Sequence, residues 1–339
     1  MVYISIVVPI RNEEKFIGQT LTALLSQDYP ASRYELIVVD GRSTDGTRSV
    51  VEQFMKNHPD KKISLLDNPG ILSSSARNIG ARAAQGKLIA IIDGHVHIPG
   101  NQLLKDMERL KEETGALCLA RPAPLDVPEI KNGTPFWIAM ARKSRLGHSR
   151  SSFIYSDYEG FVDPVSSGFA YDRTVFEKVG YFDETFDAAE DVEFHFRVKK
   201  AGIEAYTSPR FLIYSYPRES LSALFRQQVR YGEGRARFIR KHPEGFSKET
   251  LIPVGIFLYV AALPAALGIT LVSPFLTAAY LAGLFVYLGM LMIAGLEMAF
   301  KNKAVVPAFI VAAALCTVHL GLGWGFLKTR ACGSGRRNR

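Results

Sequence analysis

Short apolar runs alternate with amphipathic stretches along the first hundred residues of the chain. We expect strands at residues 5–9, 35–39, 63–66 and 88–92, because these runs are apolar and short. Helical spacing is found at residues 13–25, after Ser43 and at residues 73–84. Strands and helices in alternation at this spacing predict an α/β fold built on a doubly wound parallel sheet.

The pattern changes completely near residue 250. Residues 251–300 contain a single Asp, Glu, Lys or Arg, which is Glu297. Three apolar segments, at about 251–272, 275–296 and 304–327, are each long enough to cross a hydrocarbon layer of about 30 Å. The alternative, a buried helical subdomain, needs a large partner to cover it. We therefore expect four parts: a soluble domain (1–217), a basic juxtamembrane or interfacial segment (218–250), a transmembrane region (251–330) and a basic tail (331–339).

The course of the third apolar segment stays open. Ser273 and Pro274 join the first two segments in a tight turn, so that the second segment returns to Lys301 and Lys303. A full third crossing would then place the arginines at positions 336, 337 and 339 on the opposite side, against the positive-inside rule. The third segment is therefore re-entrant or interfacial, or the tail is an exception.

The formal net charge of +8 is concentrated before the apolar region, where residues 218–241 carry seven Lys and Arg against two Glu. Such a segment favours anionic membrane lipids, and no recognition motif for nucleic acid accompanies it. The chain enters its first strand without a charged leader, so no secretory signal peptide is expected. We expect a multi-pass protein of the plasma (bacterial inner) membrane with a cytoplasmic soluble domain.

Two strand ends carry carboxylates. Asp40 and Asp93 each follow a buried strand, at the edge where open α/β sheets bind ligands. Asp93 and His95, two residues apart, are candidate ligands for a divalent cation, which would neutralise a diphosphate. The competing interpretation of Asp93 is a turn-capping residue.

Six ordered motifs carry a resemblance to a known family. They lie at residues 7–13, 38–47, 76–80, 92–95, 179–184 and 190–197. Together they resemble glycosyltransferase family 2, whose members are inverting enzymes with a GT-A (nucleotide-diphospho-sugar transferase, Rossmann-like) fold. The apolar tail and residues 227–232 further resemble bacterial exopolysaccharide enzymes typified by succinoglycan glucosyltransferases.

The resemblance implies roles for individual residues. Asp40 would recognise the nucleobase, most often uracil, while Pro9, Glu13, Arg77 and Asp93 would complete the nucleotide site. Asp191 would be the catalytic base and Glu190 would orient the acceptor or the helix start. From the residues alone, both acids could instead favour a helix N-terminus, and Arg77 could merely cover the sheet.

The chain departs from the family pattern at His95, which replaces the last acid of an Asp-x-Asp motif. Because imidazole suits Mn²⁺ better than Mg²⁺, we expect a divalent metal with Mn²⁺ preferred.

Gly168, Gln227, Arg230 and Tyr231 are expected near the acceptor or the diphosphate. Tyr231 stands where processive synthases carry Trp, which argues against processivity. We expect a mobile turn at residues 231–234. We expect residues 121–163 to be loop-rich, with basic side chains, including Arg145 and Arg150, that form either a lid or a solvated face.

These features predict transfer of a sugar from a nucleotide sugar, with UDP as the favoured nucleotide, to a lipid-linked acceptor such as an undecaprenyl-diphosphate-linked saccharide. A polyprenyl-phosphate glycosyltransferase, a processive synthase and a degenerate nucleotide-binding scaffold remain as alternatives.

Overall fold

The computed structural model describes residues 1–148, 153–166, 168–303 and 307–331. The chain divides into two compact units, one of residues 1–127 and 151–216 and the other of residues 128–150 and 217–339. Arg150 and the tail beyond residue 331 lie outside the described residues, as does the start of the predicted third apolar segment.

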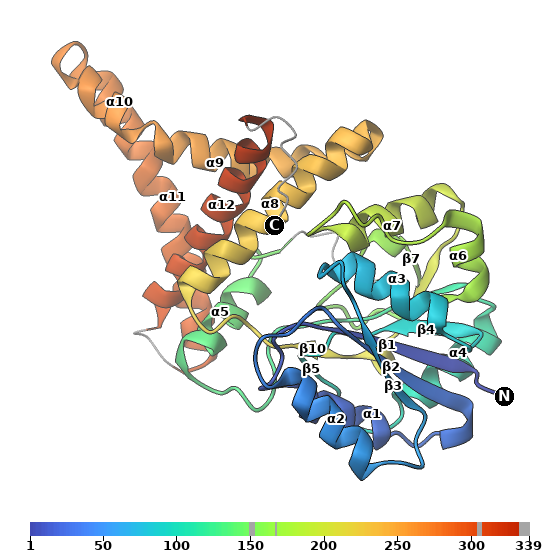
Figure 1. The fold of residues 1–339 in the computed structure, drawn as a ribbon. Coiled ribbons are helices and arrows are strands. Elements are labelled where there is room, and N and C mark those ends of the chain that lie inside the picture. The colour runs from blue at the N-terminus through green and yellow to red at the C-terminus, as the bar shows by residue number, and fades with distance from the viewer. Residues whose placement is uncertain (149–152, 167, 304–306, 332–339) are drawn as a thin grey trace. The chain divides into compact units, whose positions relative to one another are not determined.

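The first unit is built on a mixed eight-stranded sheet in the order β3-β2-β1-β4-β8-β6-β9-β7. Figure 1 labels β1, β2, β3, β4 and β7 of this sheet. Its strands are β1 (Ile4–Ile10), β2 (Tyr34–Asp40), β3 (Ile63–Asp67), β4 (Leu88–Ile91), β6 (Cys118–Ala120), β7 (Gly160–Val162), β8 (Gly168–Asp172) and β9 (Ala205–Thr207). A two-stranded sheet pairs β5 (Val96–His97) with β10 (Tyr214–Ser215).

The predicted parallel sheet is present, but only as half of the whole. Strands β1, β2, β3 and β4 run parallel to one another, as their apolar runs indicate. Strand β8 then pairs antiparallel with both β4 and β6, and β7 pairs antiparallel with β9. These strands have three to five residues each, so periodicity alone does not reveal them.

Helices cover both faces of this sheet: α1 (Ile17–Leu25), α2 (Thr47–Asn57), α3 (Ser73–Ala83), α4 (Leu103–Thr114), α6 (Arg173–Val179) and α7 (Glu190–Lys200). Alternate residues of β1 separate the two cores, because successive side chains of a strand point to opposite faces. Ile6 and Val8 belong to the core that includes α1 and α4, whereas Val7 belongs to the core with α3, α6 and α7.

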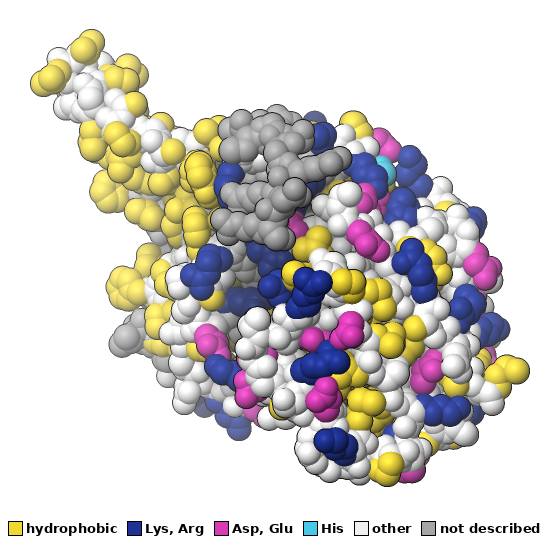
Figure 2. Space-filling view, in the orientation of Figure 1, with side chains coloured by type: hydrophobic (Ala, Val, Ile, Leu, Met, Phe, Trp, Pro, Cys, Tyr) yellow, Lys and Arg dark blue, Asp and Glu magenta, His cyan; other side chains and the backbone are white. Residues whose placement is uncertain are grey.

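The second unit is helical and comprises α5 (Gly133–Lys143), α8 (Leu221–Lys241), α9 (Leu251–Ala261), α10 (Leu263–Gly268), α11 (Pro274–Lys301) and α12 (Ala308–Ala331). Three helical stretches, at residues 248–271, 274–301 and 308–329, are long and apolar enough to cross a membrane. Hydrophobic side chains gather over the hairpin of α10 and α11 in Figure 2.

One expectation for this unit is wrong. The segment of residues 121–163 is loop-rich as expected, although it contains α5, whose residues Trp137 to Ala141 are buried. The expected mobile turn at residues 231–234 lies inside the continuous helix α8, with Gly232 and Gly234 buried. Gly232 is required by packing, because a Cβ there would lie 2.3 Å from the carbonyl oxygen of Leu322 in α12.

Candidate active site

The carboxyl ends of β1, β2 and β4 lie at one edge of the sheet, since these strands are parallel. Asp40 is the last residue of β2, and Asp93 follows β4 by two residues. Pro9 lies beside Val39 in the register of β1 and β2. Three of the predicted nucleotide-site residues therefore come from neighbouring strands at this edge.

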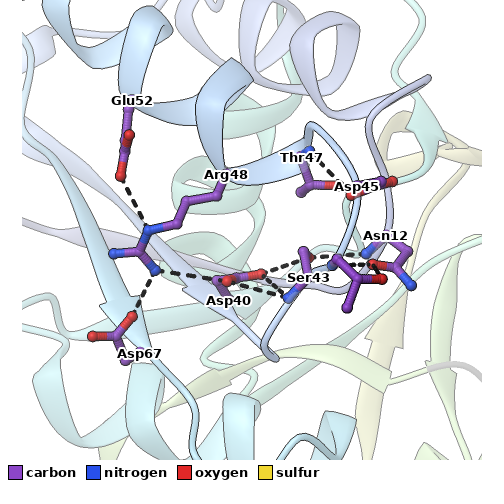
Figure 3. A network of polar contacts seen from close by, with 9 residues as sticks. Asn12, Asp40, Ser43, Asp45, Thr47, Arg48, Glu52 and Asp67 are labelled. Atoms are coloured by element: carbon purple, nitrogen blue, oxygen red, sulfur yellow. Dashed lines mark hydrogen bonds and ion pairs between the residues drawn. The ribbon is translucent and has the colours of Figure 1, made fainter.

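The loops after β1 and β2 are joined by hydrogen bonds (Figure 3). Asn12 donates its backbone N–H to Ser43 Oγ at 3.0 Å and accepts from the backbone N–H of Thr44 at 2.8 Å. Asp45 accepts from the backbone N–H of Thr47 at 3.1 Å, at the start of α2. Asn12 and Arg42 have φ angles of 56° and 57°, an unusual conformation that the two hydrogen bonds of Asn12 help to hold in the first of these loops.

Asp40 is held from two directions (Figure 3). Its Oδ1 accepts from the hydroxyl of Ser43 at 2.6 Å, and its Oδ2 lies 3.7 Å from the guanidinium of Arg48. Arg48 also binds Asp67, the residue opposite Asp40 on β3, at 2.6 Å. With 4% of its side chain exposed, Asp40 has a fixed orientation that suits recognition of one base edge.

Glu13, in the loop after β1, lies beside His95. An oxygen of Glu13 is 2.8 Å from His95 Nδ1. Carboxylates that accept from one ring nitrogen of a histidine fix the tautomer in which the other nitrogen acts as a metal ligand.

Asp93 and His95 are suitable ligands for a metal ion whose remaining ligands come from the substrate. Among the described residues, no group of three or more His, Cys, Asp and Glu side chains forms a metal cage. Asp93 and His95 are partly exposed, with 37% and 29% of their side chains accessible. A carboxylate and an imidazole fit a cation completed by diphosphate oxygens, as magnesium and manganese sites on phosphates often are.

Arg77 joins the two halves of the candidate site. Its Nη2 lies 3.4 Å from Asp93 Oδ1 and 3.6 Å from Glu190 Oε1, and its guanidinium lies over the ring of Phe182. Only 13% of the Arg77 side chain is exposed. Helix α3 therefore positions one cation between the loop after β4 and the first turn of α7.

The charged side chains around Arg77 shift the pKa values of Asp93 and Glu190. Burial by itself would raise the pKa of Asp93, but Arg77, His95 and Arg121 hold it below its usual value. The pKa of Glu190 is raised, chiefly by burial and also by Asp191, against the opposing effect of Arg77. Two neighbouring carboxyls with opposite shifts are typical of functional sites.

Glu190 and Asp191 occupy the first turn of α7, where their charge also stabilises the helix N-terminus. The preceding residue, Ala189, has a φ of 61°, so the chain turns sharply into this helix. Asp191 Oδ1 accepts from the N–H of Val192 at 2.9 Å. The helix-terminal interpretation is thus correct as far as it goes and does not exclude a catalytic role.

Gly168 lies next to His195, one turn after Asp191 on α7. A Cβ on Gly168 would be 2.9 Å from His195 Nε2, so the space beside this glycine is filled by the imidazole. The same nitrogen is 2.6 Å from the hydroxyl of Tyr171. Burial lowers the pKa of His195 to about 4.

Arg121 is a further cation near Asp93 that the sequence did not lead us to expect. Arg121 follows β6 directly, is 8% exposed, and donates to the carbonyl of Ile213 at 3.1 Å. Its charge is one of those that lower the pKa of Asp93. A cation directly after the apolar run of residues 118–120 is the signal that identifies it, as for the strand-end aspartates.

Gln227, Arg230 and Tyr231 lie on α8, in the second unit. The side chain of Gln227 is 3.2 Å from the hydroxyl of Tyr231. With its amide oriented so that each atom has a partner, its oxygen accepts from the guanidinium of Arg218 at 2.9 Å.

Comparisons with known proteins agree with this architecture. Residues 5–180 match the model of glycosyl transferase family 2, and residues 129–328 match that of glycosyl transferase family group 2. The mannosyltransferase of Pyrobaculum calidifontis, solved in complex with GDP-Man and Mn²⁺, superposes with a TM-score of 0.55. It is 20% identical and the match covers 93% of this chain and 86% of that one. This likeness confirms the GT-A fold.

Two relatives extend over most of the sequence. A dolichyl N-acetyl-α-D-glucosaminyl phosphate 3-β-D-2,3-diacetamido-2,3-dideoxy-β-D-glucuronosyltransferase of Methanococcus voltae is 30% identical over 279 residues, covering 78% of this chain and 86% of its own length. The succinoglycan biosynthesis protein ExoA of Rhizobium meliloti is 28% identical over 255 residues, 74% of each chain. The expected resemblance is confirmed, and the chain is a glycosyltransferase that belongs to glycosyl transferase family 2.

Proposed function

We propose that this enzyme transfers a sugar with inversion from a UDP-sugar to a lipid-linked saccharide, with its first unit on the cytoplasmic face of the plasma membrane. The observation that supports this best is Arg77, which lies 3.4 Å from Asp93 and 3.6 Å from Glu190. The loop after β4, which carries Asp93, and helix α7, which carries the candidate base, therefore share the guanidinium of Arg77.

Asp191 is the proposed base. As the acceptor hydroxyl attacks the anomeric carbon, its proton passes to the Asp191 carboxylate, and the bond from that carbon to the diphosphate oxygen breaks. The electron pair leaves with the nucleoside diphosphate. Glu190, more buried and next to Arg77, orients the acceptor and the start of α7. Arg77 and Arg121 add positive charge near Asp93 in the same region.

Asp93 and His95 are the residues that would hold a divalent metal, which when bound neutralises charge on the diphosphate leaving group. We propose Mn²⁺ in preference to Mg²⁺ because one ligand is an imidazole. The Pyrobaculum enzyme, which shares the fold, was solved with Mn²⁺. In His95→Asp, binding of UDP should become supported by Mg²⁺ about as well as by Mn²⁺, and an unchanged metal preference would remove His95 from the metal site.

A lipid-linked acceptor is supported by two observations. The Methanococcus relative is named for a sugar acceptor joined to dolichyl phosphate. In this chain α8 carries six Lys and Arg within 21 residues and precedes the apolar helices, so a basic surface adjoins the membrane segment. We propose an undecaprenyl-diphosphate-linked saccharide, with Gly168, Gln227, Arg230 and Tyr231 on the acceptor or diphosphate side.

The nucleotide is tested by calorimetry on the full chain in detergent. UDP should bind in the presence of Mn²⁺, and EDTA or Asp93→Ala should abolish that binding. GDP is the competing nucleotide, and tighter binding of GDP would overturn the choice of UDP. Failure of every nucleotide would favour the degenerate scaffold.

The base is tested by Asp191→Asn, with Glu190→Gln as its neighbouring control. Asp191→Asn should bind UDP normally and lose transfer by a factor of about 10³. Full transfer by this variant would contradict the assignment. Offering bare polyprenyl phosphate beside a lipid-linked saccharide separates the two acceptor classes, and product length reveals a processive enzyme.

A further inference from the structure

Helix α12 is enclosed far more than the other two apolar helices. In the most apolar window of each, half of the residues of α12 are buried, against 17% in α11 and 6% in the stretch of residues 248–271. From residue 310 to residue 323, every α12 residue is buried or half-buried. What surrounds α12 therefore decides whether it can lie in a membrane.

Helix α8 lies closely against the second half of α12. A Cβ on Gly321 would be 2.7 Å from the Cβ of Gln228, and one on Gly325 would be 2.0 Å from the carbonyl oxygen of Val229. Gly232 of α8 approaches the carbonyl oxygen of Leu322 in the same way, at 2.3 Å. These distances leave no space for lipid between the two helices.

The contacts between these helices include charged groups. Lys328 of α12 donates to Glu233 of α8 at 2.6 Å, and Arg240 donates to the carbonyl oxygen of Thr329 at 3.1 Å. Helix α8 carries six cations in all: Arg226, Arg230, Arg235, Arg237, Arg240 and Lys241. A helix of this composition does not enter hydrocarbon, because each central charge costs several kcal/mol. Residues 321–329, which pack on it, must therefore lie outside the hydrocarbon as well.

The remainder of α12 is too short to cross. Ala308 to Leu320 comprise thirteen residues, or about 20 Å of helix, whereas the hydrocarbon layer is about 30 Å thick. Within this part His319 Nε2 lies 3.1 Å from the carbonyl oxygen of Leu146, in the segment after α5 between Arg145 and Gly147. Neither half of α12 thus offers a membrane-spanning surface.

The hairpin of α9, α10 and α11 has the opposite character. At its tip the exposed fractions are 97% for Leu271, 86% for Val272 and 78% for Phe275. The Tyr259 hydroxyl donates to the carbonyl oxygen of Tyr280 at 2.7 Å and thereby joins the two legs. Figure 2 shows no charged side chain on the visible face of this projection. A surface so apolar and so exposed requires acyl chains around it.

We propose that only this hairpin enters the bilayer, and that α12 remains on the same side of the membrane as α8. The membrane partner is thus the apolar surface of residues 258–286, which ends before Tyr287, whose hydroxyl lies 3.1 Å from His319 Nδ1 of α12. Lys248 and Lys301 flank this surface on the side of entry. The arginines after α12 then lie on that side too, in accord with the positive-inside rule. This proposal does not depend on the reaction that the enzyme performs.

The test compares the two ends of the full chain. Epitope tags at the N-terminus and after residue 339 are exposed to protease in inverted vesicles and in intact spheroplasts. Both tags should be cut in inverted vesicles and both should be protected in spheroplasts. A C-terminal tag that is cut in spheroplasts while the N-terminal tag is protected would show that α12 crosses and would overturn the proposal.

A matched control shows that the assay detects a crossing. In a second chain, twenty Leu and Ala residues are inserted between residue 339 and the tag, which should move the tag to the opposite side. A C-terminal green fluorescent protein gives an independent readout, because it should fluoresce in the original chain and become dark in the extended one. A dark fusion on the original chain would contradict the proposal in the same way as the protease result.

Discussion

The imidazole of His95 and the carboxylate of Glu13 are joined by a contact of 2.8 Å between Nδ1 and Oε1. Glu13 also donates its backbone N–H to Thr47 Oγ1 at 2.7 Å, which ties this loop to the start of α2. Because the acid is anchored in this way, it can hold the ring of His95 in one orientation. Glu13 is thus a positioning residue for His95.

This relationship predicts different effects for two substitutions of Glu13. Glu13→Ala removes the acceptor at Nδ1 and should weaken Mn²⁺ binding in the presence of UDP about tenfold. Glu13→Gln keeps an oxygen that can accept from Nδ1 and should remain close to the wild type. Electron paramagnetic resonance of free Mn²⁺ during titration measures both. Equal losses in the two variants would indicate that Glu13 acts through its charge, or on the nucleoside directly.

Arg77 should matter for both stability and nucleotide binding. Arg77→Ala leaves Glu190 and Asp93 close together without their shared cation, at an expected cost of about 3 kcal/mol and a melting temperature lower by roughly 5–10 °C. The control is Arg82→Ala on the same helix, where an exposed arginine lies 3.9 Å from an exposed Glu184. That change should cost less than about 1 kcal/mol. Similar melting temperatures for the two variants would contradict the bridging role of Arg77.

Arg48 should influence the nucleobase through Asp40. Removing its guanidinium leaves Asp40 with the Ser43 contacts alone, so Arg48→Ala should weaken UDP binding roughly fivefold. Glu52 is another partner of Arg48 but does not contact Asp40, and Glu52→Ala should leave UDP binding unchanged. Calorimetric titration of UDP and GDP measures both affinity and selectivity. An unaltered UDP affinity in Arg48→Ala would show that Ser43 alone positions Asp40.

The sequence predicted strand-end residues better than it predicted their partners. Asp40 and Asp93 were identified because an apolar run predicts a buried parallel strand and therefore the position at which that strand ends. Arg121 likewise follows an apolar run, but a shorter one. The contacts of Glu13 with His95 and of Arg48 with Asp40 join residues that are far apart or separated by a turn, which no local pattern reveals. Gly232 of α8 was misinterpreted as part of a turn because the residue that it contacts in α12, Leu322, lies 90 residues further along the chain.

His195 should make stability depend on pH. Its folded-state pKa of about 4 is below the ordinary 6.5, so between these values the unfolded chain binds more protons and stability falls as the pH falls. From pH 7 to pH 5 the loss is about 2 kcal/mol. His195→Gln cannot titrate and still offers Tyr171 a partner, so its melting temperature in detergent should change less over this range. An equal slope for both proteins would assign the acid sensitivity to other groups.

The contact between α8 and α12 can be tested by a substitution that adds one methyl group between the two helices. Gly325→Ala would place a Cβ 2.0 Å from the carbonyl oxygen of Val229, so the helices must separate at a cost of roughly 1–3 kcal/mol. Gly289→Ala on α11 adds the same atom where no neighbour lies within 4 Å, and it should leave the melting temperature unchanged or slightly raised. Both variants are measured in lipid nanodiscs. If Gly325→Ala matches the wild type, α8 does not pack along α12 in the membrane-bound enzyme, and the argument that keeps α12 outside the bilayer fails with it.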